Sequence, residues 1–360
     1  MRLPEELPAW TVAVPLLALA VLAGTWGRVL LLALLPLIVL VLFAAVFAAV
    51  HHAEIIAHRV GEPFGTLVLA VAVTVIEVAL IISLMLAGGE GAATLARDTV
   101  FATLMIVCNG ALGLCLLVGG LRHRVQTFQV DGAKGALSVL TAIAVLTIIV
   151  PVYTTSTAGP TFSAGQLAFA GVSSLVLYGV FVFVQTVRHR DYFLPVDAAD
   201  EGEHAAPPST RVSLAALALL LACLVAVVGL AKVMSPYIEG AVAAFGAPQA
   251  VVGIAIALLV LLPETVAALR AAVRNRLQTS FNLSLGSALA SIGLTIPVVA
   301  ALSVVLGTPL HLGLGPKETV LLALTLLLST LTVGTGRTTI LQGAVHLVVF
   351  AAFLFLAIVP

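Results

Sequence analysis

The chain has 360 residues, of which 16 are Lys or Arg and 16 are Asp or Glu, so the formal net charge is zero. Charged residues make up 9% and hydrophobic residues 61%, whereas soluble domains carry about 25% charged residues. Too few charges are present to cover a surface that faces water. This composition excludes a soluble enzyme and predicts a protein that lies in a lipid bilayer, with no nucleic-acid partner and no cofactor.

Eleven apolar stretches, bounded by charges, Gly or Pro, are long enough to be membrane-spanning helices. Strands of a membrane β-barrel alternate over about ten residues, whereas these runs are continuous, so we expect an all-α polytopic fold. The segment before the first stretch lacks a signal peptide's basic region and cleavage site, so that stretch should stay as a membrane helix. The expected helices span residues 9–26, 29–50, 63–87, 99–121, 135–155, 164–187, 212–234, 249–272, 281–305, 317–335 and 338–358.

The loops between these helices fall into two sets with unequal basic charge. One set contains Arg28, Arg97, Lys232 and Lys317. The N-terminal set contains the other twelve bases, which are Arg2, Arg59, Arg122, Arg124, Lys134, Arg188, Arg190, Arg211, Arg270, Arg274, Arg276 and Arg337. Because cytoplasmic loops carry the excess of Lys and Arg, we expect a multi-pass cell (inner) membrane protein with a cytoplasmic N-terminus and an outside C-terminus.

A polar stretch divides the chain into comparable halves. Residues 188–211 are the longest such stretch. Between Asp191 and His204 it contains Asp191, Asp197, Asp200, Glu201 and Glu203 and no Lys or Arg. We interpret it as an acidic cytoplasmic linker, with a low-affinity cation sensor as the alternative because carboxylates suit hard cations. The predicted domains are an N-terminal helix (1–28), a five-helix repeat (29–187), this linker and a second five-helix repeat (212–360).

The two halves share a pattern that ends in one acidic residue. Gly61-Glu62-Pro63 leads through an apolar run to Glu77, and Gly246-Ala247-Pro248 leads through another to Glu264. The following helices carry small polar residues, and their alignment places Asn109 opposite Ser287. By the loop assignment the two acidic helices run in opposite directions. Inverted repeats with a polar site at their interface are a recurring plan of transporters.

Glu77 and Glu264 are therefore the candidate site residues. A charged side chain at the centre of a membrane costs about 2.5–3.5 kcal/mol, and neither acid has an intramembrane Lys or Arg as partner. Each acid alone is compatible with a protonated residue at a helix interface, whereas matched acids in inverted repeats predict a shared cation site. Pro263 can break its helix and free carbonyl oxygens for that site. The neighbouring polar groups are Asn109 and Ser287, with Thr74, Ser83, Asn282 and Ser291 as supporting residues.

Two nearby carboxylates in a low dielectric cannot both remain ionised without a cation, so protons and cations compete for them. This competition predicts an antiporter. An intramembrane enzyme with paired carboxylates is disfavoured because no second catalytic motif accompanies the acids, and a channel suits buried titratable acids less well. His51, Glu54 and His58 share a helical face and could hold zinc, although a juxtamembrane charge cluster is the favoured interpretation.

Four segments resemble the calcium/cation antiporter superfamily, and within it the bacterial calcium/proton antiporters of the ChaA type. They are GEPFGTLVLAVAVTVIEVALI (61–81), RDTVFATLMIVCNGALGL (97–114), QTVRHRDYFL (185–194) and LLPETVAALRAAVRNRLQTSFNLSLGSALASIGLTIPVV (261–299). The resemblance implies that Glu77 and Glu264 bind the cation and the proton, and that Asn109 and Ser287 support them from the next helix.

The sequence departs from the wider superfamily at the acidic pentads. Many calcium/proton exchangers carry Gly-Asn-Ala-Thr-Glu there, whereas this chain has Val-Thr-Val-Ile-Glu (73–77) and Val-Leu-Leu-Pro-Glu (260–264). Only Thr74 offers a polar substitute for the missing Asn. Ca²⁺/H⁺ exchange is the first expectation, with Na⁺/H⁺ or K⁺/H⁺ exchange as the alternative, and the sequence does not indicate an oligomeric state.

Overall fold

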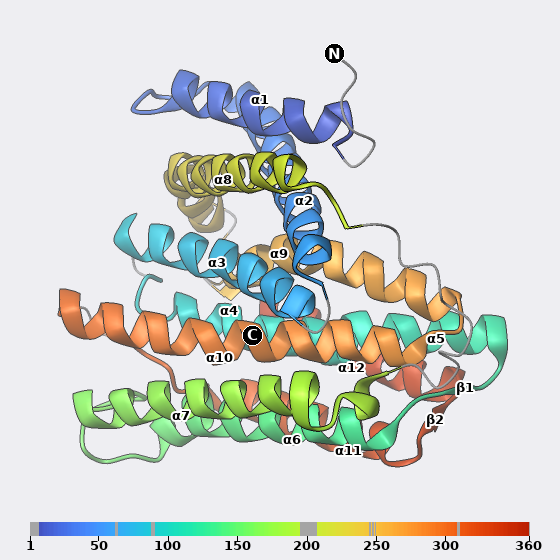
Figure 1. Cartoon of the computed structure of the whole chain (residues 1–360). Helices are drawn as coiled ribbons and strands as arrows, with labels where there is room; N and C mark the ends of the chain where they lie inside the picture. The colour runs from blue at the N-terminus through green and yellow to red at the C-terminus, as the bar shows by residue number, and fades with distance from the viewer. Residues whose placement is uncertain are drawn as a thin grey trace. The chain divides into compact units, whose positions relative to one another are not determined.

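The computed structural model describes residues 7–61, 64–87, 91–194, 207–244, 246, 248, 250–307 and 310–359. These residues are almost entirely helical (Figure 1). The α-helices are α1 (Ala9–Thr25), α2 (Leu35–Val60), α3 (Phe64–Ala87), α4 (Leu95–Met105), α5 (Leu112–His123), α6 (Val130–Ala144), α7 (Ala164–Phe183), α8 (Thr210–Ala244), α9 (Ala250–Val273), α10 (Leu277–Leu306), α11 (Pro316–Gly334) and α12 (Ile340–Ile358).

Short π-helices, 3₁₀ turns and two strands lie between or continue these helices. The π-helices are η2 (Ile106–Ala111), η3 (Val145–Ile149) and η5 (Val184–Arg188). The 3₁₀ turns are η1 (Leu32–Leu34), η4 (Val150–Val152) and η6 (Arg190–Phe193). Two short strands, β1 (Gln126–Thr127) and β2 (Arg337–Thr338), pair with each other in antiparallel orientation.

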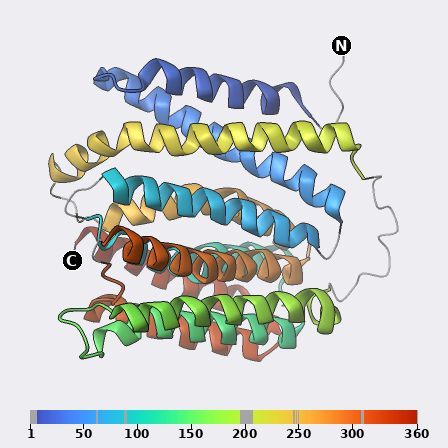
Figure 2. The ribbon, with the colours of Figure 1, turned by 60° about the vertical axis from the view of Figure 1, so that its left-hand side comes forward.

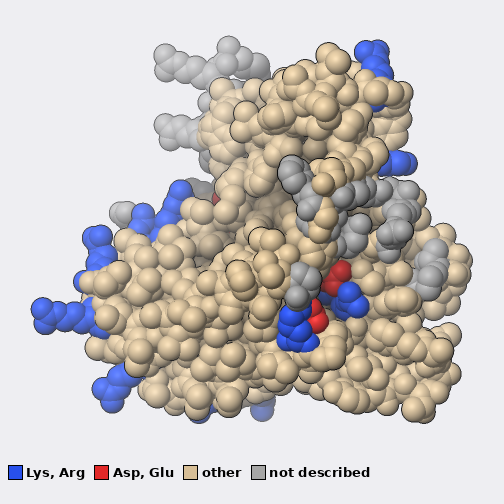
Figure 3. All heavy atoms as spheres, turned by 180° about the vertical axis from the view of Figure 1, so that it is seen from behind, with Lys and Arg blue, Asp and Glu red and all other residues tan. Residues whose placement is uncertain are grey.

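Ten helical segments in the described part of the chain are long and apolar enough to cross a membrane, and α1 is a shorter apolar helix of 17 residues. They correspond one to one with the eleven expected helices, which confirms the all-α polytopic fold. Uncharged residues cover most of the face in Figure 3, and Lys and Arg lie mainly toward its edges. The main differences from expectation are two longer helices. Helix α2 continues beyond residue 50 to Val60 and is followed by Gly61, which has a positive φ of 79°. Helix α8 continues beyond residue 234 to Ala244.

The described residues form two compact units. Unit 1 comprises residues 1–92 and 202–246, and unit 2 comprises residues 93–201 and 247–360. In unit 1, α2 crosses α1 and α8 obliquely (Figure 2), with a core cluster of Leu7, Ile55, Val212 and Ala216.

Unit 2 is built around one interrupted helix. The segments α4, η2 and α5 form a single span, Leu95–His123, which has the largest buried share of any described span. It packs against α9, α10, α11 and α12, so it is the centre of the unit. The surrounding helices run along nearly the same axis (Figures 1 and 2).

Glycines allow two pairs of helices in unit 2 to approach closely. A Cβ atom on Gly113 of α5 would lie 3.0 Å from the Cβ of His346 in α12, and one on Gly293 of α10 would lie 2.9 Å from the Cβ of Tyr178 in α7. The first pair joins the third helix of the first half to the last helix of the second half. The second pair joins the third helix of the second half to the last helix of the first. This reciprocal packing is what inverted five-helix repeats produce.

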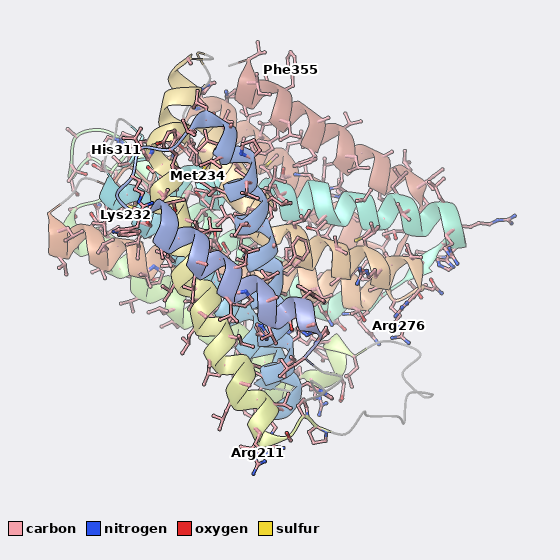
Figure 4. The ribbon with its side chains drawn as sticks, turned by 90° about the horizontal axis from the view of Figure 1, so that it is seen from above. Arg211, Lys232, Met234, Arg276, His311 and Phe355 are labelled. Atoms are coloured by element: carbon pink, nitrogen blue, oxygen red, sulfur yellow. The ribbon has the colours of Figure 1, made fainter. Side chains whose placement is uncertain are left out.

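At each end of unit 2, a loop from the first half of the chain contacts a loop from the second half. At one end β1, which follows α5, pairs with β2, which precedes α12, and Gln126 Nε2 donates to the Ala272 carbonyl at 2.9 Å. At the other end Thr161, between α6 and α7, bridges His311, between α10 and α11. Figure 4 shows Arg276 and His311 at opposite ends of α10. The loops within unit 2 thus separate into the two sets that the basic residues predicted.

The zinc alternative for His51, Glu54 and His58 is not supported. Within the ranges that the structure describes, no group of three or more His, Cys, Asp or Glu side chains could hold a metal ion. Between His51 and Glu54, His52 is buried, and its Nε2 lies 2.9 Å from the carbonyl oxygen of Thr11 in α1. This contact helps to fix α2 against α1.

The glycine contacts yield a stability prediction. Gly343→Val in α12 should destabilise the protein by about 2 kcal/mol, because a Cβ there would meet the Leu117 amide nitrogen and lie 2.9 Å from the Gly113 carbonyl oxygen of α5. Thermal unfolding in detergent measures the change. Gly135→Val is the matched control, since nothing lies within 4 Å of a Cβ at Gly135 in α6. Equal melting temperatures for the two variants would contradict the proposed close contact.

Candidate functional site

Glu77 lies in α3 of unit 1, and its side chain is only 2% exposed. Thr74, one turn earlier, and Ser83 are buried polar residues of the same helix. The Thr74 hydroxyl donates to the Ala70 carbonyl at 2.9 Å, and the Ser83 hydroxyl donates to the Val228 carbonyl of α8 at 3.5 Å. Both supporting hydroxyls therefore use their protons on backbone oxygens, which leaves lone pairs of the hydroxyl oxygens as possible ligands.

Glu264 lies in α9 of unit 2 and is half-buried. The helix continues from Ala250 to Val273 with Pro263 inside it, so the expected break at this proline does not occur. Proline has no amide hydrogen, so the carbonyl four residues earlier, that of Leu259, lacks its usual helical donor. Pro263 thus frees one backbone oxygen without interrupting the helix.

The register between α4 and α9 places Glu264 at the level of Asn109. The helices run in the same direction, because Gly253 packs against the backbone of Asp98 and Thr99, and Ala268 packs with Cys115 further along. Asn109 is eleven residues after Asp98, and Glu264 is eleven residues after Gly253. At about 1.5 Å per residue, both lie roughly 16 Å from this contact, which is about half the thickness of a bilayer core.

The hairpin of α9 and α10 places a further hydroxyl at this level. Ser280 Oγ of α10 donates to the Ala268 carbonyl of α9 at 2.7 Å. Ser284 lies one turn after Ser280, and Glu264 lies one turn before Ala268, so the antiparallel helices bring them to the same level. Ser284 is 4% exposed, and its hydroxyl has no hydrogen-bond partner within the described residues. The repeat alignment instead selected Ser287, which is half-buried and lies almost a turn further along α10. The hairpin register is the signal that would have found Ser284.

Asn109 is fully buried in the π-helix η2, and both ends of its amide are hydrogen-bonded. Its Nδ2 donates to Thr325 Oγ1 of α11 at 2.8 Å, and its Oδ1 lies 3.0 Å from Nδ1 of His346 in α12. Neither partner was identified from the sequence. π-Helical turns are frequent at functional sites, and this one lies against α9 and α10.

The remaining predicted residues occupy different parts of α10. Ser291 is buried two turns beyond Ser284. Asn282 lies near the start of the helix, where its Nδ2 donates to the Phe193 carbonyl and its Oδ1 accepts from Gln278 at 3.0 Å. Unit 2 therefore brings Glu264, Asn109 and the serines of α10 onto adjacent helices, whereas Glu77 belongs to unit 1. The shared site of the two acids stays a prediction.

Several charged residues lie away from this level. Asp98, at the start of α4, accepts from Arg97 Nε and forms an ion pair with Arg97 Nη2, both at 2.8 Å. The charge of Asp98 is thus neutralised locally. Glu62, Pro63, Glu90, Ala247 and the linker acids Asp197, Asp200, Glu201 and Glu203 lie outside the described residues.

Comparison with known proteins identifies relatives over nearly the whole chain. The family model described as sodium/calcium exchanger protein matches residues 29–187 and 215–359. The protein y4hA of Sinorhizobium fredii (strain NBRC 101917 / NGR234), which bears the name of an ionic transporter, is 54% identical over 99% of this chain and 97% of its own length. The sodium-potassium/proton antiporter ChaA of Escherichia coli (strain K12) is 37% identical over 94% of this chain and 93% of its own.

A solved structure shares the fold. The Ca²⁺/H⁺ antiporter YfkE superimposes with a TM-score of 0.73, covering 98% of this chain and 99% of its own, at 17% sequence identity.

The two serines of α10 give a paired prediction. Ser280→Ala should lower the free energy of unfolding by about 1 kcal/mol because it removes a buried hydrogen bond. Ser284→Ala should leave it unchanged or raise it slightly, because it removes a buried hydroxyl without a partner among the described residues. Denaturant titration of the purified protein, without added cations, measures both. An equal loss in the two variants would show that Ser284 has a structural partner.

Proposed function

We propose that this chain, which belongs to the sodium/calcium exchanger protein family, is a secondary antiporter that exchanges Ca²⁺ for protons across a membrane. It is a transporter and not an enzyme. Support comes from the 37% identity with a sodium-potassium/proton antiporter and from the fold of a Ca²⁺/H⁺ antiporter. The transported cations and protons are its substrates, and lipid is its solvent.

One observation carries the proposal, namely the burial of the Glu77 carboxyl group in a membrane-spanning helix at 2% exposure. A carboxyl group buried inside the membrane must be protonated, or its charge must be compensated by a cation. Glu264 is the matched acid of the second repeat. A cation bound by both carboxylates displaces protons, and protons that bind both carboxylates displace the cation, so each form that crosses is electrically compensated.

The proposed ligands are carboxylate, amide and hydroxyl oxygens. Glu77 and Glu264 supply the charge, and Asn109 and Ser287 support them from the following helices. Thr74, Ser83, Asn282 and Ser291 are the supporting polar members of the predicted set. To these we add Ser284, whose hydroxyl lies at the level of Glu264 and has no hydrogen-bond partner among the described residues. Hard cations such as Ca²⁺ take six to eight oxygen ligands, so carbonyl oxygens and water would complete the shell.

Ca²⁺ is our first assignment because two carboxylates balance one divalent cation. Na⁺ or K⁺ in exchange for protons is the second candidate, and the name of the Escherichia coli relative favours it. The absence of an Asn from both acidic pentads removes two neutral oxygen ligands from the predicted site. Selectivity then depends on how many other oxygens converge on the carboxylates.

The proposed topology follows from the basic residues. The end of unit 2 that carries β1 and β2 faces the cytoplasm, as do the N-terminus and the acidic linker 188–211. The C-terminus faces outside, in a cell inner membrane. The functional repeats are residues 29–187 and 212–360, and the helix in residues 1–28 lies outside both. With this orientation, inward proton flow drives cations out of the cell.

Everted membrane vesicles test the exchange. Addition of Ca²⁺ should dissipate a preformed ΔpH in vesicles that contain the protein, and Glu77→Gln or Glu264→Gln should reduce the rate at least about a hundredfold, because the carboxylate can no longer release a proton to the cation. Quenching of a pH-sensitive acridine dye reports the ΔpH. Parallel additions of Na⁺ and K⁺ rank the three cations.

Glu318→Gln provides the matched control. Glu318 lies at the start of α11, is partly exposed and pairs with Lys317 at 3.4 Å, so its loss should leave the exchange rate within about twofold. Wild-type exchange in either Glu77→Gln or Glu264→Gln would refute the site assignment.

The shared site has a separate geometric test. In a background without Cys108, Cys115 and Cys223, the double variant Glu77→Cys, Glu264→Cys should bind Cd²⁺ between its thiolates. Bound Cd²⁺ should raise the melting temperature by several degrees, an effect that neither single variant shows. Two sites rather than one would be indicated if the double variant showed only the sum of the single-variant effects.

A further inference from the structure

His346 lies in α12, is 2% exposed, and takes part in a row of buried hydrogen bonds through unit 2. Its Nε2 lies 3.0 Å from Thr332 Oγ1, and its Nδ1 lies 3.0 Å from Asn109 Oδ1. Asn109 Nδ2 in turn donates to Thr325 Oγ1 at 2.8 Å. The row therefore connects α11, α12 and the π-helix η2.

The direction of every hydrogen bond in this row follows from its last member. The single proton of Thr325 Oγ1 has the Leu321 carbonyl at 2.8 Å as its nearer acceptor and Met105 Sδ at 3.4 Å as a second one, so toward Asn109 this hydroxyl accepts. The NH₂ group of Asn109 must then face Thr325, and its oxygen must face His346. His346 consequently carries its proton on Nδ1, and its Nε2 accepts from the Thr332 hydroxyl.

All donors thus point the same way, from Thr332 through His346 and Asn109 to Thr325 and Leu321. Hydrogen bonds arranged in this way polarise and strengthen one another in a low dielectric. The result is a single orientation of the Asn109 amide, whose oxygen keeps one lone pair beyond the one that His346 uses. This amide belongs to the helical turn level with Glu264, on a helix that packs directly against α9.

We propose that His346 is a positioning residue of the cation site, which sets cation affinity by holding the Asn109 amide and the η2 turn in place. This inference rests on the proposed function of Glu264. His346 need not touch the cation. The Gly113 contact explains how it comes close enough, because the backbone of α5 lies directly against the Cβ of His346.

Asparagine and glutamine replacements separate this role from simple packing. An Asn side chain places its NH₂ group near the position of Nδ1, whereas a Gln side chain reaches the position of Nε2. His346→Asn should keep the donor to Asn109, and its half-saturating Ca²⁺ concentration should stay within about twofold of wild type. His346→Gln should raise that concentration about tenfold, the effect of one lost buried hydrogen bond, with the maximal rate within about twofold.

The assay is Ca²⁺-dependent proton release in liposomes that contain equal amounts of each purified variant. Thr325→Val removes the acceptor that fixes the Asn109 amide, so it should also raise the half-saturating Ca²⁺ concentration. If His346→Gln does not fold, this variant tests whether the orientation of the amide sets cation affinity. Thr147→Val is the control. Thr147 is buried in the same unit, but its hydroxyl bonds only within its own helix, to the Ile143 carbonyl at 2.8 Å.

Three results would overturn the inference. The first is a wild-type half-saturating concentration in both His346→Gln and Thr325→Val. The second is an equal loss of maximal rate in His346→Asn and His346→Gln at unchanged affinity, which indicates packing alone. The third is an equal affinity change in Thr147→Val. Failure of the proposed function is distinguishable, because Glu264→Gln would then still exchange Ca²⁺ for protons whatever the His346 variants do.

Discussion

A carboxyl group inside a bilayer can be charged only when a cation or a hydrogen-bonded environment compensates it, and the functional argument for this chain depends on that constraint. Glu77 is almost completely buried in a helix whose neighbouring residues are largely apolar. The cost of its charge makes proton binding and cation binding alternatives at the same oxygen atoms. An exposed acid could change partners freely without coupling one ion to another. Burial is therefore what couples the two ions, and the rest of the fold must keep water and stray cations away from the acid.

Close helix packing organises unit 2, which carries Glu264. The hydrophobic effect does not drive helix association in lipid. Close packing of small residues and buried hydrogen bonds between helices stabilise the association instead. Gly113 and Gly343 bring α5 and α12 together, and Gly253 brings α9 against α4. These contacts fix registers as well as distances, because a glycine admits a neighbouring backbone at one level only. The level shared by Glu264, Asn109 and Ser284 follows from those registers.

The sequence predicted the eleven helices because apolar length is a local signal. Repeated motifs pointed to the two acids, and their shared site stays a prediction. The repeat alignment selected Ser287 because it compares positions in the sequence. Ser284 comes from the α9–α10 hairpin register, which depends on the turn at 274–276 and on the Ser280 hydrogen bond. His346 gave no sequence signal, since its partner Asn109 is 237 residues away. Pro263 can break a helix, but α9 continues through it from Ala250 to Val273.

Buried polar groups in unit 2 fall into two kinds, and the difference bears on ion exchange. The row from Thr332 to Leu321 is completely satisfied and has one allowed direction, so it resists rearrangement. Ser284, in contrast, is buried with its hydroxyl unpartnered among the described residues, and such a group costs free energy until a ligand arrives. A site that must release its ion in every cycle needs both kinds. Rigid amides keep the geometry that the ion recognises, and unsatisfied oxygens give the bound state its advantage without binding the ion permanently.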